Sequence, residues 1–196
     1  MSDYYATLDK INVPTTVSGR VTAELEMAEP GKFAVTNPEI YGQGSFSKKA
    51  DCNGYEVIVD TKGTLLWPDA ADMEKTYLIL TGENVTKEYL DYLDGQHISW
   101  IACGKKNVDL VRAVEILSEQ FHVERMGIVG GPKINTAFLK AGLLDEISIL
   151  IGAGIDGRGG MPAVFDGLEM SHDVTALKLT DVQKFDSGAV WIRYAV

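Results

Sequence analysis

The segment MGIVGGPKINTAFLKAGLLDEISIL, residues 126–150, constrains the fold more than any other part of the sequence. A short apolar run leads into Gly130 and Gly131, apolar residues then recur at helical spacing, and a second apolar run follows Gly142. This order predicts a strand, a tight turn, a helix and another strand. Pro132 suits the first helical turn, and Gly142 suits the helix end. Such a unit indicates an α/β domain built on a parallel sheet.

Apolar runs and helix-period segments alternate through the rest of the chain, and no linker or repeat divides it. We therefore expect one domain over residues 1–196, with a mostly parallel central sheet, a C-terminal antiparallel hairpin and helices on both faces. The predicted strands are 14–18, 55–60, 76–81, 97–103, 125–129 and 146–151, followed by a hairpin of 174–185 and 189–196. The predicted helices are 3–11, 88–93, one that follows residue 107, and 133–141.

Two regions are predicted in more detail. Residues 29–54 contain two prolines and four glycines, which indicates a long irregular excursion. The helix after residue 107 is expected to begin with Asn107 as its N-cap. Its apolar residues predict one buried face, made of Leu110, Val111, Val114, Leu117 and Phe121.

Composition and charge exclude several classes of function. The net charge of −10 repels a phosphate backbone, so we expect no nucleic-acid partner. No run of about 18 apolar residues is present, so no membrane span is expected. The first residues, MSDYYATLDK, lack the basic start and apolar run of a secretory signal, so we expect a cytoplasmic location.

The cysteines and histidines show no arrangement that indicates a metal or catalytic site. Cys52 and Cys103 are isolated, so we expect structural thiols. His97, His122 and His172 lie far apart and lack ligand spacing. No metal site is expected, and no catalytic nucleophile or acid–base pair can be assigned.

Three glycine-containing segments are candidates for ligand binding. Gly130 and Gly131 could let phosphates approach the helix N-terminus, or could serve only a tight turn. In SGRVT, residues 18–22, a glycine, an arginine and a threonine could bind phosphate, or the arginine could be an ordinary surface residue. GAGIDG, residues 152–157, matches a dinucleotide-binding fingerprint but is followed by RGGMPAVFDG, which cannot open the required helix. We interpret it as a loop that could flank a substrate site through Arg158 and Phe165.

Two of these motifs together, GRVT and IVGGPKINTAFLKAGLLDEISI, resemble the dihydrofolate reductase superfamily, and in particular its riboflavin-biosynthesis reductase branch. That branch comprises the C-terminal domain of bifunctional deaminase-reductases and stand-alone relatives, and the resemblance runs from about Ser18 to the C-terminus. It implies the three-layer dihydrofolate-reductase-like fold, NADPH as cofactor and a homodimer. In this family, the peptide bond between the two glycines of the turn can be cis.

The resemblance also implies which residues bind the cofactor. Gly19, Arg20 and Thr22 would bind the pyrophosphate and the 2'-phosphate of NADPH. Gly130 and Gly131, followed by Pro132, would approach the pyrophosphate. The expected secondary contacts are Thr81, Gly104 and Lys105.

The chain departs from the branch at two places. Members usually carry a glutamate where this chain has Val129, which leaves the substrate open. They also open with a strand and an acidic turn some thirty residues before the GRxT motif, whereas about eighteen residues precede Gly19 here. We therefore expect this first strand to be missing or replaced.

The activity predicted on this resemblance is NADPH-dependent reduction of a small heterocycle, either pterin-like or ribosylaminopyrimidine-like. A dihydrofolate reductase proper and a catalytically silent NADPH-binding protein are the alternatives. For the enzymes, the cofactor supplies the hydride while the protein binds, orients and excludes water.

Overall fold

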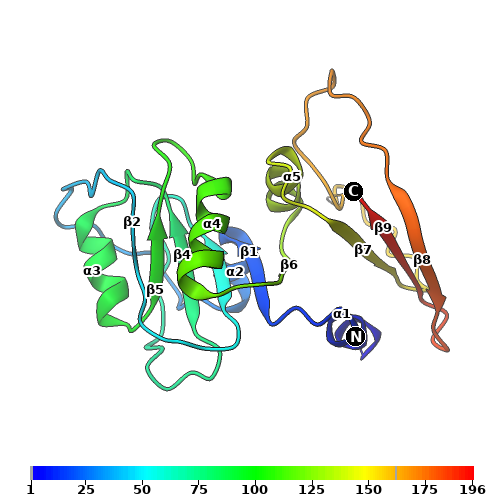
Figure 1. Ribbon diagram of the computed structural model, residues 1–196, viewed down its shortest axis with the longest axis horizontal. Coiled ribbons are helices and arrows are strands. Elements are labelled where there is room, and N and C mark those ends of the chain that lie inside the picture. Colours follow the sequence, from blue (N-terminus) through cyan, green and yellow to red (C-terminus); the bar gives the residue numbers. More distant parts are fainter. Residues whose placement is uncertain (1, 162) are drawn as a thin grey trace.

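The computed structural model describes residues 2–161 and 163–196, and its largest element is a six-stranded sheet of order β2-β5-β4-β3-β1-β6 (Figure 1). Its neighbouring strands are parallel except for β2, which pairs antiparallel with β5. The strands are β1 (Thr15–Gly19), β2 (Ser45–Ser47), β3 (Glu56–Val59), β4 (Tyr77–Thr81), β5 (Ser99–Ala102) and β6 (Met126–Ile128).

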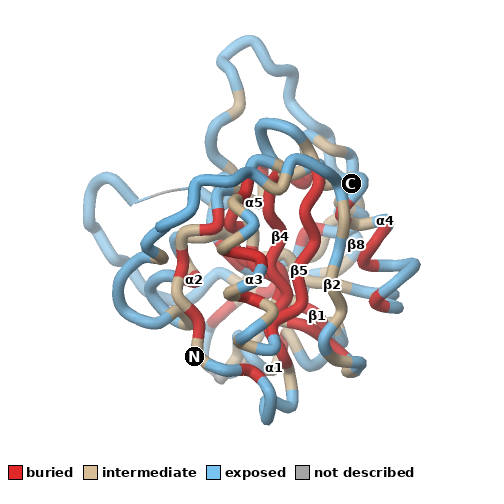
Figure 2. Tube along the Cα trace, turned by 90° about the vertical axis from the view of Figure 1, so that its left-hand side faces the viewer, coloured by how far each residue is buried: buried red, intermediate tan, exposed pale blue. Residues whose placement is uncertain are grey.

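Helices cover both faces of this sheet. They are α2 (Arg20–Glu26), α3 (Lys87–Gly95), α4 (Leu110–Phe121) and α5 (Pro132–Lys140), with α1 (Ser2–Ile11) at the start of the chain. Residues of α2 and α3 share one hydrophobic core with the sheet, and residues of α4 and α5 share the other. All residues of β4 and β5 are buried, because both faces are covered (Figure 2). The predicted three-layer α/β fold is confirmed.

The C-terminal strands form a second sheet that is separate from the first. β7 (Glu146–Ile151), β9 (Val190–Ala195) and β8 (Lys178–Lys184) pair antiparallel in the order β7-β9-β8. The predicted hairpin is thus present, but β7 does not pair with β6, the preceding strand. Helix α1 packs against this second sheet, where the Lys10 ammonium donates to Gln183 at 3.2 Å and lies 5.7 Å from the centre of the Trp191 ring.

Three local predictions were wrong or incomplete. Asp109, not Asn107, caps α4 and accepts from the Arg112 amide at 3.1 Å, because Asn107 lies in the tight turn that begins at Gly104. Val111 was predicted on the buried face of α4 but is 46% exposed. The residues that α4 buries are Ala113, Ile116, Leu117 and Phe121. The region 29–54, predicted to be irregular, contains the short strand β2.

Across the described residues, every helix is too short or too polar to cross a membrane.

Candidate functional site

The candidate site lies at the carboxyl ends of the parallel strands. Because β1, β3, β4, β5 and β6 are parallel, their carboxyl ends meet at one edge of the sheet. Ligands of open α/β sheets bind outside this edge. Along it, the order of the strands brings Gly104, Thr81, Asp60, Gly19 and Gly130 into one row.

Gly19 and Gly130 meet where β1 and β6 end. A Cβ atom added to Gly19 would lie 3.9 Å from the carbonyl oxygen of Gly130 and 3.2 Å from Cγ1 of Ile134 in α5. A Cβ added to Gly130 would lie 2.9 Å from Oγ of Ser18. A side chain at position 130 would therefore collide with Ser18, whereas one at position 19 would require Ile134 to move by a few tenths of an ångström. These contacts favour glycine at both positions independently of a ligand.

Gly131 differs from its neighbour, because open space surrounds it. It has φ of +79°, and a Cβ added there would meet no atom of the described residues within 4 Å. Gly131 is also the N-cap residue of α5 and supplies no side-chain cap, and Pro132 occupies the first turn. Amide groups in this turn lack partners within the helix and point outward, with the positive end of the helix dipole. The peptide bond between Gly130 and Gly131 is trans, not cis.

Two buried hydroxyl groups at this edge have no hydrogen-bond partner among the described residues. They are Oγ of Ser18, next to the Gly130 turn, and Oγ1 of Thr81, at the end of β4. A buried polar group without a partner is destabilising unless water or a ligand satisfies it. Thr81 was predicted from the sequence, whereas Ser18 was missed. Only its position beside the glycine of SGRVT could have indicated it.

Arg20 and Thr22 lie in α2, directly after Gly19. The guanidinium of Arg20 bonds to the carboxylate of Glu24 at 2.6 Å, and both side chains are more than one-third exposed. An anionic ligand must therefore compete with Glu24 for Arg20. Thr22 is half-buried on the same helix.

Gly104 and Lys105 form a second group at the far end of the row. They line a cavity of about 630 Å³, together with Glu83, Cys103, Asp109 and Arg112 among others. The Gly104 amide donates to the Glu83 carboxylate at 3.1 Å, and the Glu83 amide donates to the Gly104 carbonyl at 2.9 Å. Four strand spacings, about 19 Å, separate this group from Gly130. Only an elongated ligand could contact both.

The glycine-rich segment after β7 has neither helix nor strand in its described residues, as the sequence predicted, but β8 begins at Lys178 and not at residue 174. Pro162 lies outside the described residues. Its second part lies against the start of α5, where the Asp166 amide donates to Oγ1 of Thr136 at 2.9 Å and the Asn135 side chain donates to the Val164 carbonyl at 2.8 Å. Phe165 is thereby held near the Gly130 turn. Arg158 is exposed and bonds to Asp156 in its own loop, at 2.5 and 2.6 Å.

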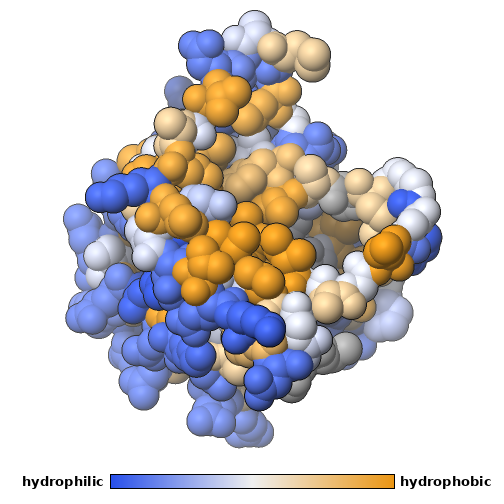
Figure 3. Space-filling view, turned by 90° about the vertical axis from the view of Figure 1, so that its right-hand side faces the viewer, coloured by the Kyte–Doolittle hydropathy of each residue, from blue (hydrophilic) through white to orange (hydrophobic). Residues whose placement is uncertain are grey.

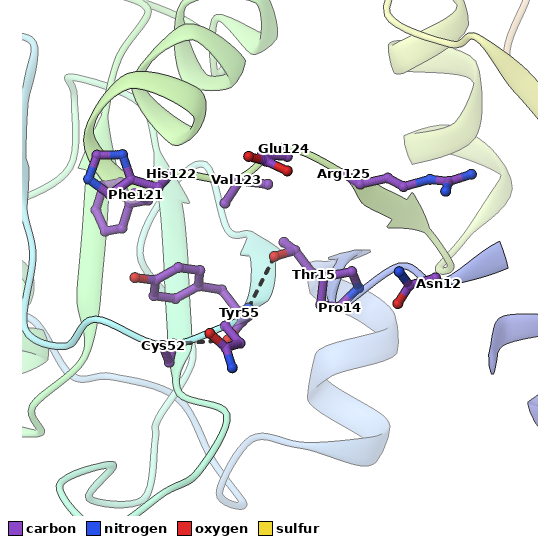
Figure 4. Close-up of a pocket in the computed structure, with 12 residues that line it drawn as sticks. Asn12, Pro14, Thr15, Cys52, Tyr55, Phe121, His122, Val123, Glu124 and Arg125 are labelled. Carbon is purple, nitrogen blue, oxygen red and sulfur yellow. Dashed lines mark hydrogen bonds between the residues drawn. The ribbon is translucent and has the colours of Figure 1, made fainter. Parts of the chain in front are cut away.

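A second cavity, of about 340 Å³, lies at the opposite edge, by the amino ends of β1, β3 and β6 (Figure 4). In its lining, the Tyr55 amide donates to Oγ1 of Thr15 at 3.2 Å, and the Cys52 thiol donates to the Gly54 carbonyl at 2.9 Å. None of the predicted ligand-binding residues lines it. The carboxyl edge therefore remains the candidate site.

The thiol of Cys103, which lines the larger cavity, is held in its protonated form. Burial raises its pKa to about 11, so the nucleophilic thiolate is scarce at neutral pH. Within the described residues, no three His, Cys, Asp or Glu side chains are grouped so that they could hold a metal ion.

Several solved structures of other proteins have a fold similar to that of this chain. A pyrimidine reductase-like protein from Corynebacterium diphtheriae superposes with a TM-score of 0.65 at 17% identity, over 94% of this chain and 76% of that one. RibD from Acinetobacter baumannii gives a TM-score of 0.58 at 20% identity, over 93% of this chain. A deaminase/5-amino-6-(5-phosphoribosylamino)uracil reductase from Thermotoga maritima gives 0.60 at 16% identity, over 97%. This chain spans 46% and 48% of the last two proteins.

A comparison at the level of sequence families identifies the chain more closely. The profile of the RibD C-terminal domain matches residues 27–191, most of the chain. The matched range includes β2 to β8, the Gly130–Gly131 turn and both ends of the row at the carboxyl edge. The chain therefore belongs to the RibD C-terminal domain family.

Proposed function

We propose that the protein is an NADPH-dependent reductase of a ribosylaminopyrimidine-like or pterin-like heterocycle, with the cofactor lying across the carboxyl edge of the six-stranded sheet. Membership of the RibD C-terminal domain family supports the reductase class. The observation that carries the placement is the open space at Gly131, in front of the uncapped first turn of α5. A phosphate there would be bound by backbone amides and favoured by the helix dipole.

The residues at this edge fit an elongated dinucleotide. The turn at Gly130 and Gly131 would hold the pyrophosphate, with Gly19 allowing close approach and Pro132 fixing the start of the helix. Oγ of Ser18 and Oγ1 of Thr81 are buried hydroxyls that a ligand or water could satisfy. Arg20 would release the Glu24 carboxylate and bind the 2'-phosphate in its place. The Thr22 hydroxyl would be a neighbouring donor. Gly104 and Lys105 would contact the far end.

The bound cofactor would supply the hydride, so no side chain of this protein need attack the substrate. Phe165, which the loop contacts hold beside α5, would flank the heterocycle and help exclude water. Arg158 lies on the same loop, and release from Asp156 would free it to bind an anionic group of the substrate.

A pair of glycine variants tests the placement of the pyrophosphate. Gly131 and Gly142 lie at opposite ends of α5, both have positive φ, and neither has an atom within 4 Å of an added Cβ. Valine at either position should strain the backbone to a similar extent, about 1–3 kcal/mol. Gly131→Val should abolish NADPH binding in isothermal titration, whereas Gly142→Val should bind normally. Equal affinities of the two variants would contradict the placement.

Turnover assays separate the candidate activities. Oxidation of NADPH, followed by its absorbance, is expected with a ribosylaminopyrimidine phosphate. Turnover of dihydrofolate instead would identify a dihydrofolate reductase. Binding without turnover of either heterocycle would identify a silent NADPH-binding protein. A role of Arg20 at the 2'-phosphate predicts that NADPH raises the melting temperature more than NADH at equal concentration.

We also infer a homodimer from the surface of the second sheet. Ile149, Ile192 and Val182 are opposite one another across its three strands, and Leu179 and Val182 are each 54% exposed. Apolar side chains gather on the side of the molecule where β8 and β9 lie (Figure 3). Exposed apolar patches of this kind mark interaction sites. Sedimentation equilibrium should give a dimer, and the Val182→Glu variant should give a monomer.

A cytoplasmic location of the protein stays a prediction.

A further inference from the structure

Helix α2 carries its charges in an order that opposes its own dipole. Arg20 is its first residue, Glu24 and Glu26 lie toward its end, and it has no acidic residue in its first turn and no basic residue in its last. The first turn of a helix favours acids and the last turn favours bases. An i,i+4 ion pair also stabilises a helix less when the base precedes the acid. The stability of α2 therefore does not explain this arrangement.

The ion pair between Arg20 and Glu24 lies beside the candidate cofactor site. Nη1 of Arg20 is 2.6 Å from Oε2 of Glu24, and the two side chains are 40% and 38% exposed. Arg20 directly follows Gly19, and a Cβ atom added to Gly19 would lie 3.9 Å from the carbonyl oxygen of Gly130. Local rules of stability are broken most often at functional sites. We therefore looked for a role of Glu24 in binding rather than in folding.

An exposed pair of this kind can be exchanged for a stronger one. Exposed i,i+4 pairs change an equilibrium by only about twofold. A phosphate monoester carries about two negative charges near neutral pH and accepts parallel hydrogen bonds from a guanidinium group. The 2'-phosphate of NADPH can therefore displace the Glu24 carboxylate from Arg20, but part of its binding free energy is lost in that exchange.

NADH differs from NADPH in having a hydroxyl group where NADPH has the 2'-phosphate. A neutral hydroxyl does not displace a carboxylate, so Arg20 stays paired with Glu24 when NADH is bound. The Glu24 carboxylate also repels the 2'-phosphate directly, in a chain whose net charge is already −10. Both effects weaken the binding of NADPH and leave the binding of NADH unchanged.

We propose that Glu24 is a specificity-determining residue, which narrows the preference of this protein for NADPH over NADH. It holds Arg20 when no 2'-phosphate is present and competes for Arg20 when the phosphate is bound. Glu24 is thus a positioning residue that acts through Arg20 and need not contact the dinucleotide. This proposal rests on the cofactor site described under the proposed function.

Isothermal titration of the full chain with NADPH and with NADH tests this role without any substrate. The measured quantity is the selectivity ratio, which is the Kd of NADH divided by the Kd of NADPH. Glu24→Gln keeps the shape of the side chain and removes its charge. It should raise the ratio about fivefold through tighter binding of NADPH, with the Kd of NADH within about twofold. Both Arg20 and Glu24 are exposed, so the substitution leaves the core untouched.

Glu26→Gln is the matched control, because it removes the same charge from the same helix. Residues two positions apart on a helix do not face each other, so Glu26 lies on a different side from Glu24. Its side chain is exposed as well. The selectivity ratio of Glu26→Gln should stay within about twofold of that of the unaltered chain.

A double-mutant cycle tests whether Glu24 acts through Arg20. In the Arg20→Ala background, Glu24→Gln should change the selectivity ratio by less than about twofold. A merely structural role of Glu24 would change the two affinities together and leave their ratio constant. The cycle therefore separates a role in specificity from a role in folding.

Three results would overturn the proposal and leave the cofactor site in place. The first is saturable binding of NADPH with a ratio that changes less than about twofold in Glu24→Gln. The second is an equal rise in Glu26→Gln, which would mean that only the total charge matters. The third is a rise that persists in the Arg20→Ala background. Failure of the unaltered chain to bind either dinucleotide would instead contradict the cofactor site itself, and this proposal with it.

Discussion

The strands of the six-stranded and the three-stranded sheets differ in how far they are covered. In β4, YLILT, every residue is buried between α-helical layers. In β8, KLTDVQK, none is buried, although Leu179 and Val182 are apolar. The central strands of the first sheet are therefore fully covered within this chain. The second sheet, with an exposed face and an open edge, depends on further contacts for equivalent burial.

The largest predicted effect compares one leucine from each sheet. Leu78 in β4 is fully buried, and Leu179 in β8 is 54% exposed. Leu78→Ala should lower the free energy of unfolding by about 2–5 kcal/mol, because it leaves a cavity in a packed core. In the monomer, at low protein concentration, Leu179→Ala should change it by about 0.5 kcal/mol or less. Urea unfolding of both variants measures the difference. A loss for Leu179→Ala that grows with protein concentration would support the proposed dimer, whereas a large loss in the monomer would show that the chain itself covers this side chain.

A smaller effect is expected at the N-terminus of α4, which covers the first sheet. Asp109→Ala should cost about 0.5–2 kcal/mol, because the Asp109 carboxylate accepts from the Arg112 amide. Asn107→Ala is the matched control and should leave the free energy of unfolding nearly unchanged. If Asn107→Ala were the more damaging substitution, the capping assignment would be wrong.

The smallest effect concerns one ion pair from each region. Arg193 and Glu146 bridge β9 and β7 with two bonds of 2.6 and 2.8 Å, and the Arg112–Glu115 pair lies on α4 with both side chains half exposed. Glu146→Gln should cost about 0.2–1 kcal/mol, and Glu115→Gln less. Both losses should shrink in 1 M salt because of screening. Urea unfolding at low and high salt tests this order, and a larger loss for Glu115→Gln would reverse it.

Local sequence patterns predicted most of the fold because most of its elements are locally specified. The segment 126–150 carries its own strand, turn and helix signals, and the structure has β6, α5 and β7 there. The strand β2 could not be predicted, since Ser45–Ser47 is short and exists through its pairing with β5, more than fifty residues away. The division into two sheets is likewise a property of long-range pairing, which periodicity does not encode.

The candidate site was predictable only in part, for related reasons. Gly19 and Gly130 end neighbouring parallel strands, and the structure places them together. Arg20, however, bonds to Glu24 one helical turn away, and this i,i+4 spacing is visible in the sequence. The unpartnered hydroxyl of Ser18 depends on burial by distant segments, which the sequence does not reveal.

The most direct test of the central claim is an NMR titration of the full chain with NADPH, because the two edges of the six-stranded sheet carry separate cavities. The amides of Gly19, Gly130 and Gly131 should shift with saturation, while those of Tyr55 and Arg125 at the opposite edge should not. Shifts confined to Tyr55 and Arg125, or no saturable shift at the three glycines, would contradict a cofactor site at the carboxyl edge.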